Sequence, residues 1–121
     1  MSAPIGPYTP IVRAGPWLIC SGQLGLHQSP AVLVDGGARA QMTQALSNAE
    51  QLLLDNGATL EQVVKTTVFV TDAEQFPVVN EAYVAFFGHH RPARSMVAVV
   101  ALPAGAAVEV EVWAYAPSPT G

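Results

Sequence analysis

The segment 107–115 constrains the fold most strongly, because residues of two kinds alternate along it. One set is apolar and the other is acidic or aromatic: Val108, Val110, Val112 and Ala114 against Glu109, Glu111, Trp113 and Tyr115. This period of two predicts a β-strand with one face against a core and the other face open. The chain is therefore expected to contain a sheet with two unlike faces.

Four further segments have the properties of strands. Residues 63–70 are rich in Val and Thr, which favour strands. Residues 11–13 and 17–21 flank the turn Ala14-Gly15-Pro16 and predict a hairpin. Residues 95–101 predict an apolar strand that ends before Leu102-Pro103-Ala104-Gly105, and residues 31–34 predict a short additional strand.

Two segments change to a helical period. In residues 38–56, apolar side chains recur every three or four positions, and Gly57 is a suitable left-handed stop. Thr71-Asp72-Ala73-Glu74 has the Thr-x-x-Glu form of a capping box and predicts the start of a second helix. The apolar face of that helix is expected to contain Phe76, Val79, Tyr83 and Phe86 or Phe87.

The element order β-β-(β)-α-β-α-β-β predicts an α+β domain with two layers. Two helices covering one face of a mixed sheet is the economical packing for these elements. At 121 residues the chain is expected to form one domain, residues 1–121, with residues 116–121 as a frayed, Pro-rich end.

The composition favours an oligomer and disfavours polyanionic partners. Only 12% of residues are charged, about half the usual share, so part of the surface is expected to be buried against other subunits. The net charge is −4 and the five basic residues are scattered, which argues against nucleic acid and membrane surfaces as partners. No signal peptide or membrane span is visible, so a cytoplasmic protein is expected.

Arg94 is the first candidate functional residue. It follows Pro92-Ala93 at the start of a predicted strand, where a fixed turn can present its planar guanidinium to a carboxylate through two hydrogen bonds. The alternative is a surface arginine paired with an Asp or Glu side chain.

Glu109 and Glu111 form a second candidate, since both side chains point to the open face of their strand. Paired carboxylates can do acid–base work, but residues two apart on a strand lie only about 7 Å apart, so the pair is a weak signal by itself. Solvated strand glutamates are the alternative. Burial of that face would favour the first interpretation, because it shifts carboxylate pKa values.

The remaining candidates carry weaker signals. The glycine of Ser21-Gly22-Gln23 indicates a close backbone approach to a ligand or to a packing neighbour. Cys20, the only cysteine, is expected to be a buried structural thiol, which leaves no intrachain disulfide and no Cys-based zinc site. His89-His90 has no accompanying metal-binding pattern, and no glycine-rich nucleotide loop is present.

Several short motifs occur in order along the chain and together resemble one family, the RidA family, also called the YjgF or reactive intermediate deaminase family. The resemblance runs from about residue 5 to residue 114. Its motifs are Ile5-Gly6-Pro7-Tyr8, Ser21-Gly22-Gln23, Val64-Lys65-Thr66-Thr67-Val68-Phe69-Val70, Val79-Asn80-Glu81-Ala82-Tyr83, Pro92-Ala93-Arg94-Ser95, Leu102-Pro103 and Val108-Glu109-Val110-Glu111.

The resemblance implies a chorismate-mutase-like fold and a homotrimer with clefts between subunits. It also implies an activity: hydrolysis of reactive 2-enamines and 2-imines, such as 2-aminoacrylate or 2-iminobutanoate and 2-iminopropanoate, to 2-keto acids and ammonia. These intermediates are released by pyridoxal-phosphate enzymes. The deaminase itself is expected to use no cofactor and no metal.

The motifs also imply roles for individual residues. Arg94 matches the arginine that holds the substrate carboxylate, and Glu109 matches the glutamate that places or activates water. Tyr8 and Ser21 match pocket positions, and Asn80 matches the asparagine of the family signature.

Two features depart from the family pattern. Met96 stands where bacterial members often have cysteine, at a position whose main chain faces the ligand. The segment Gly88-His89-His90-Arg91 is shorter than in the familiar enteric members, so the pocket rim and the preferred substrate size are expected to differ.

Other functions remain open at this stage. The same fold is compatible with a binding protein for small carboxylates or 2-keto acids, and with a divergent enzyme of a specific pathway, because fold does not fix function. The family's older name, ribonuclease and translation inhibitor, suggests a nuclease, but the acidic net charge argues against that activity.

Overall fold

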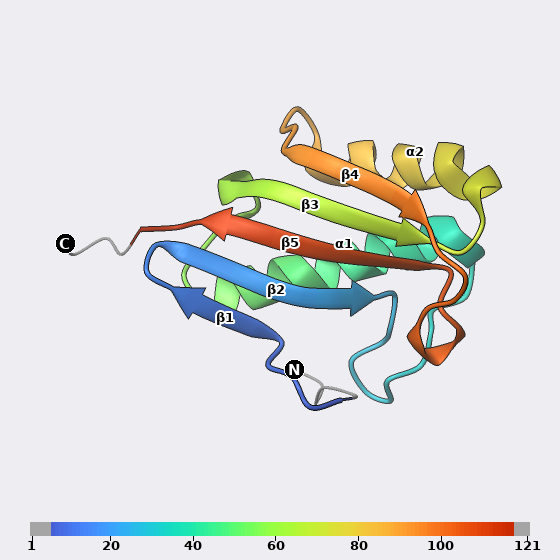
Figure 1. The fold of residues 1–121 in the computed structure, drawn as a ribbon, viewed down its shortest axis with the longest axis horizontal. Coiled ribbons are helices and arrows are strands. Elements are labelled where there is room, and N and C mark those ends of the chain that lie inside the picture. Colours follow the sequence, from blue (N-terminus) through green and yellow to red (C-terminus); the bar gives the residue numbers. More distant parts are fainter. Residues whose placement is uncertain (1–5, 118–121) are drawn as a thin grey trace.

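The computed structural model describes residues 6–117, which form a five-stranded sheet with two long helices on one face (Figure 1). The strands are β1 (Ile11–Ala14), β2 (Trp17–Leu24), β3 (Val63–Val70), β4 (Ala93–Ala98) and β5 (Val108–Tyr115). The helices are α1 (Gly37–Asp55) and α2 (Phe76–Phe87). The predicted α+β class, with two layers and a mixed sheet, is confirmed.

The sheet order is β1-β2-β5-β3-β4, which places β5 in the centre. All neighbouring strands are antiparallel except β3 and β4, which are parallel. A parallel pair requires a crossover, and α2 supplies it. Strand β4 lies at one edge of the sheet.

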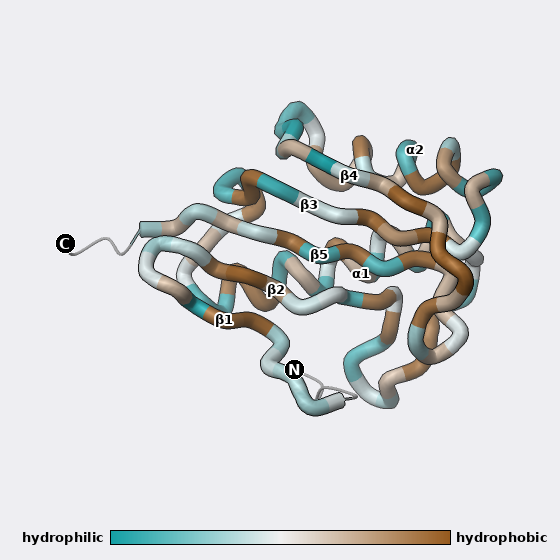
Figure 2. Tube along the Cα trace, in the orientation of Figure 1, coloured by the Kyte–Doolittle hydropathy of each residue, from teal (hydrophilic) through white to brown (hydrophobic). Residues whose placement is uncertain are grey.

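The core lies between the sheet and the helices. The apolar set of β5 is at most 1% exposed, as the alternation predicts, and it packs with Leu18, Val68 and the buried face of α1. Figure 2 shows apolar residues along all five strands. The opposite face of the sheet is not covered by any described element, and Trp113 and Tyr115 are 42% and 46% exposed there.

Buried amides of α1 hold the segments next to the centre of the sheet. Asn48 donates from Nδ2 to the carbonyls of Leu24 and Leu26, at 3.1 and 3.0 Å. Gln41 accepts a hydrogen bond from the backbone N–H of Ala107 at 2.8 Å. Helix α1 therefore fixes both the end of β2 and the start of β5.

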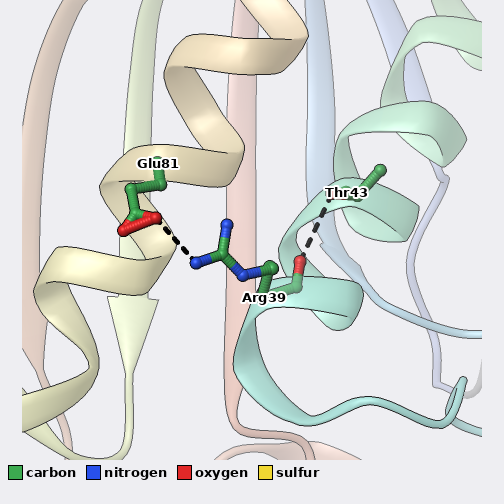
Figure 3. Close-up of polar contacts among 3 residues, drawn as sticks. All are labelled: Arg39, Thr43 and Glu81. Carbon is green, nitrogen blue, oxygen red and sulfur yellow. Dashed lines mark hydrogen bonds and ion pairs between the residues drawn. The ribbon is translucent and has the colours of Figure 1, made fainter.

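The two helices are also joined at the surface by an ion pair. Arg39 of α1 and Glu81 of α2 lie 2.7 Å apart, and both side chains are more than half exposed (Figure 3). Thr43 donates to the carbonyl of Arg39 on the same helix. Solvent screens such a pair, so it contributes little to stability.

The start of the second helical region differs from the prediction. Asp72, not Thr71, is the N-cap: its Oδ1 accepts from the backbone N–H of Glu74 at 2.9 Å. The N–H of Thr71 is already bonded to the carbonyl of Ala107, which keeps Thr71 at the end of the sheet. A short 3-10 turn, Ala73–Gln75, then leads into α2.

Other predicted elements also differ from the structure, including β2, which continues to Leu24 and does not end at residue 21. Residues 31–34 form no strand, only an isolated bridge between Leu26 and Leu33. Strand β4 covers residues 93–98 and not 95–101, because after Val99 donates to the carbonyl of Val70 the chain leaves the sheet. Helix α1 begins and ends one residue earlier than predicted, and Gly57 does adopt the left-handed conformation, with φ of 82°.

The C-terminal end is partly held in place. Within the end predicted as frayed, Ala116 is 2% exposed, its N–H donates to the carbonyl of Pro16 at 2.7 Å, and its carbonyl accepts from Arg13. Residues 118–121 of that prediction, and Ile5 of the first motif, lie outside the described residues. Among residues 6–117, no helix is long and apolar enough to cross a membrane.

Candidate functional site

A pocket of about 220 Å³ opens beside the paired ends of β2 and β5. It is lined by Tyr8, Ser21, Gly22, Leu24, Pro103 and Glu109. Three of the site residues predicted from the sequence, Tyr8, Ser21 and Glu109, therefore meet in one place. Leu24 and Pro103 were not predicted as site residues.

An irregularity in β2 shapes this pocket. The register of β2 on β5 shifts between Cys20 and Gln23, so Ser21 and Gly22 are not paired as ordinary strand residues. Ser21 donates from its N–H to the carbonyl of Pro10 at 2.8 Å and from Oγ to the carbonyl of Thr9 at 2.6 Å. These two bonds hold the segment that carries Tyr8 against β2.

Gly22 makes the close approach that the sequence predicts, and its neighbour is Glu109. A Cβ built on Gly22 would lie 1.7 Å from Oε2 of Glu109, so any larger residue would displace the carboxylate. The sequence left a ligand and a packing neighbour as alternatives. The structure shows that the carboxylate rests against the backbone at this point.

The surroundings of Glu109 favour its neutral form. Partial burial raises the pKa of Glu109, and the charge of Glu111 on the same face raises it further. The predicted pairing of these two carboxylates on one face is confirmed. A raised pKa makes the carboxylate a stronger base, so Glu109 is suited to accept a proton from water.

Arg94 lies elsewhere, on the edge strand β4. Its Nη1 donates to Oδ1 of Asn80 at 2.8 Å, and its guanidinium carbon lies 4.8 Å from the centre of the Tyr83 ring. Within residues 6–117 Arg94 forms no ion pair, so the surface pairing considered as the alternative does not occur. Arg94 as a whole is exposed.

Arg94 and Glu109 lie on opposite faces of the sheet. Arg94 is in register with Thr66, which bonds to Tyr83 of α2 and therefore faces the helices. Glu109 lies between Val108 and Val110, which are buried on the helix side, so its side chain faces the open side. Strand β3 also separates the two strands, by about 10 Å in total. One chain alone does not bring these two residues together.

The pocket is not lined by Met96, which was predicted to bind substrate, or by Cys20 or His90, which were not. Met96 is in register with buried Val68, and its half-buried side chain packs against the core. Burial raises the pKa of the Cys20 thiol to about 12, which agrees with a structural thiol. His90 is bonded to the carbonyl of Val63 at 2.7 Å, and residues 6–117 contain no cluster of three metal-ligating side chains.

The sequence model of the family described as Endoribonuclease L-PSP matches residues 1–116. The chain belongs to this family, the RidA/YjgF family. A 2-iminobutanoate/2-iminopropanoate deaminase of Mus musculus is 42% identical over 109 residues, which are 90% of this chain and 81% of that protein.

Solved RidA-family structures share the fold. RidA from an Antarctic Psychrobacter has a TM-score of 0.90 at 38% identity, covering 94% of this chain and 92% of that one. TdcF of E. coli with bound serine has a TM-score of 0.89 at 31% identity, covering 94% and 91%. Relatives named as deaminases support an enzymatic activity in this family.

One residue of this RidA-family chain gains a contact that sequence reasoning missed. Tyr83 is predicted only as a member of the apolar face of α2, and it is buried as predicted. Its ring, however, lies under the guanidinium of Arg94. The parallel register of β4 on β3 creates this contact, and a sequence pattern carries no signal for that register.

Proposed function

We propose that this protein is a deaminase of the 2-iminobutanoate/2-iminopropanoate type, which hydrolyses 2-imino acids and their enamine tautomers, such as 2-aminoacrylate, to 2-keto acids and ammonia. It works in the cytoplasm without a cofactor. The main observation is a carboxyl with a raised pKa, that of Glu109, held in a pocket with Tyr8 and Ser21. The deaminases among its relatives support the same conclusion.

The active assembly is a homotrimer with clefts between subunits. Since Arg94 and Glu109 lie on opposite faces of one chain, a complete site needs Arg94 from one copy and Glu109 from another. The open sheet face offers a surface for this contact: Trp17 packs edge-on with Trp113 and Tyr115, at centroid distances of 6.1 and 5.2 Å. The low share of charged residues, 12%, fits a surface buried in an oligomer.

The chemistry needs few groups. An enamine first takes a proton on carbon to become the iminium, which is already electrophilic. Arg94 binds the substrate carboxylate through two parallel hydrogen bonds and fixes the imino carbon beside the pocket. Glu109 accepts a proton from water as the C–O bond forms. It returns this proton to the amine nitrogen of the hydroxy-amine intermediate, and it accepts the hydroxyl proton as the C–N bond breaks and the C=O bond forms. Ammonia takes up that proton and leaves as ammonium, together with the 2-keto acid.

An assay with trapped imine tests the activity. An amino-acid oxidase generates 2-imino acids in solution, and semicarbazide captures them before they hydrolyse. The wild-type protein is expected to lower semicarbazone formation, and Arg94→Ala is expected to restore it. Arg39→Ala is the matched control, because Arg39 is also exposed but pairs with Glu81 on the helices. Equal semicarbazone formation with and without the wild-type protein would contradict the proposal.

A binding role is the second candidate, because TdcF holds serine in its crystal structure. In that case the cleft binds small carboxylates or 2-keto acids without physiological turnover. Calorimetric titration with 2-ketobutyrate would then show binding, while no imino acid would be hydrolysed. Hydrolysis of any of these imino acids would show that the protein is an enzyme and would contradict a purely binding role.

A further inference from the structure

The guanidinium of Arg94 is held on two sides by α2. Its carbon lies 4.8 Å from the centre of the Tyr83 ring, within the range of a cation–π interaction. Its Nη1 also donates to Oδ1 of Asn80, one helical turn before Tyr83, at 2.8 Å. An exposed arginine side chain has many rotamers, so these two contacts restrict where its free N–H groups point.

Tyr83 is itself held in place by contacts in the core. The residue is 4% exposed, and its hydroxyl shares a hydrogen bond of 2.8 Å with the hydroxyl of Thr66, which is fully buried. The ring also packs against that of Phe87, with centroids 4.7 Å apart. Burial raises the pKa of Tyr83, so the ring stays neutral and attracts Arg94 through its π face.

We propose that Tyr83 is a positioning residue, which holds the guanidinium of Arg94 in the orientation that receives a substrate carboxylate. This inference rests on the proposed function, in which Arg94 binds that carboxylate. Asn80 supports the same orientation from the other side, since its amide oxygen bonds to Arg94. The alternative role for Tyr83 is packing alone, which would stabilise the fold without affecting how a carboxylate binds.

Affinities for an acid and for its neutral analogue separate these roles. The ligands are 2-ketobutyrate and 2-oxobutanamide, which differ only in the group that Arg94 would recognise. Tyr83→Leu is expected to weaken the binding of 2-ketobutyrate roughly 3- to 30-fold. It is also expected to raise KM for the imino acid by a similar factor, with a smaller change in kcat. The affinity of the Tyr83→Leu variant for 2-oxobutanamide is expected to stay unchanged. Tyr83→Phe keeps the ring and is expected to keep the affinity for the acid.

A fluorination series at position 83 tests the ring without changing its shape. Phenylalanine analogues with increasing numbers of fluorine atoms withdraw electrons from the ring and weaken its attraction for a cation. The logarithm of the affinity for 2-ketobutyrate is expected to fall with each fluorine. This measurement remains decisive if Tyr83→Leu does not fold. Leu46→Ala, which opens a cavity in the core beside α1, shows what loss of stability alone does to the affinity.

The outcomes distinguish this inference from the proposed function. Equal weakening of the acid and the amide, no trend with fluorination, or an undiminished effect of Tyr83→Leu in an Arg94→Ala background would overturn the positioning role. If Arg94→Ala weakens acid binding and the Tyr83 substitutions do not, this inference fails alone. If Arg94→Ala leaves acid binding unchanged, the proposed function fails, and this inference fails with it.

Discussion

The carboxylate of Glu109 rests directly against the backbone of Gly22, where a Cβ would lie 1.7 Å from Oε2. The contact joins two central strands, β2 and β5, at the point where their register shifts. It places an acidic group in a half-buried position at the pocket wall, and that burial raises the pKa of Glu109. Both proton transfer and local stability are expected to depend on this contact.

Gly22→Ala tests the contact itself. The added methyl group would push the carboxylate out of the pocket wall, so kcat/KM for 2-iminobutanoate is expected to fall at least about tenfold. Because the displaced atoms are the end of a flexible side chain, the free energy of unfolding is expected to fall by less than about 1 kcal/mol. The imine-trapping assay and denaturant unfolding measure the two effects.

The control for this prediction is the double variant Gly22→Ala/Glu109→Ala. Removing the carboxylate relieves the clash, so the double variant is expected to regain stability while it stays inactive. Full activity in Gly22→Ala would show that the position of the carboxylate does not matter.

The charge of Glu111 provides a pH test. Glu111 raises the pKa of Glu109, so Glu111→Gln is expected to lower that pKa. Glu109 acts as a base only when ionised, and kcat/KM therefore falls on the acid side as Glu109 is protonated. The acid limb of the pH profile is expected to move to lower pH in Glu111→Gln. An unmoved limb would mean that another group controls it.

The pH dependence of stability follows from the same pKa. The pKa of Glu109 is higher in the folded state than in the unfolded state, so the folded state binds the proton of this carboxyl more tightly. The free energy of unfolding therefore falls as pH rises through the pKa of the folded state. The glutamine side chain of Glu109→Gln does not titrate and carries no charge at any pH. It is expected to be more stable than wild type at pH 7, with the difference vanishing below the ordinary glutamate pKa of about 4.3. Unfolding by urea at several pH values measures this, and a difference independent of pH would contradict it.

Asn48 is expected to be the polar side chain of α1 with the largest effect on stability. It donates to the carbonyl of the last residue of β2, Leu24, and to that of Leu26, and its Oδ1 accepts from Gln28 and Gln44. Asn48→Ala removes the donor for the carbonyls of Leu24 and Leu26, and it is expected to lower the free energy of unfolding by about 2–4 kcal/mol. Arg39→Ala, at the exposed ion pair, is expected to cost less than about 1 kcal/mol. Equal losses in the two variants would contradict this ranking.

Period and composition predicted most of the fold. The alternation in residues 107–115 predicted both the buried and the open face of β5, and the spacing in residues 38–56 predicted α1 within one residue. The failures were local. Asp72 caps the second helical region in place of Thr71, because a hydrogen bond to Ala107 keeps Thr71 in the sheet, and that bond joins residues far apart in sequence.

The site was predictable in part. Gly22 predicted a close approach, but its partner, Glu109, is 87 positions away and is brought there only by strand pairing. Arg94 was expected to meet a carboxylate, and its support by Tyr83 depends on the register of two parallel strands. Contacts of this kind are set by topology, which local patterns do not contain.

In the proposed mechanism, Arg94 and Glu109 act together from two different copies of the chain. Mixed oligomers of two inactive variants test this pairing. Arg94→Ala and Glu109→Gln chains, each with its own tag, are refolded together, and oligomers that carry both tags are isolated. Each variant alone is expected to be inactive. In a trimer that contains both variants, one of the clefts joins an intact Arg94 to an intact Glu109. About one third of wild-type activity is therefore expected. Mixed oligomers with no activity would contradict it.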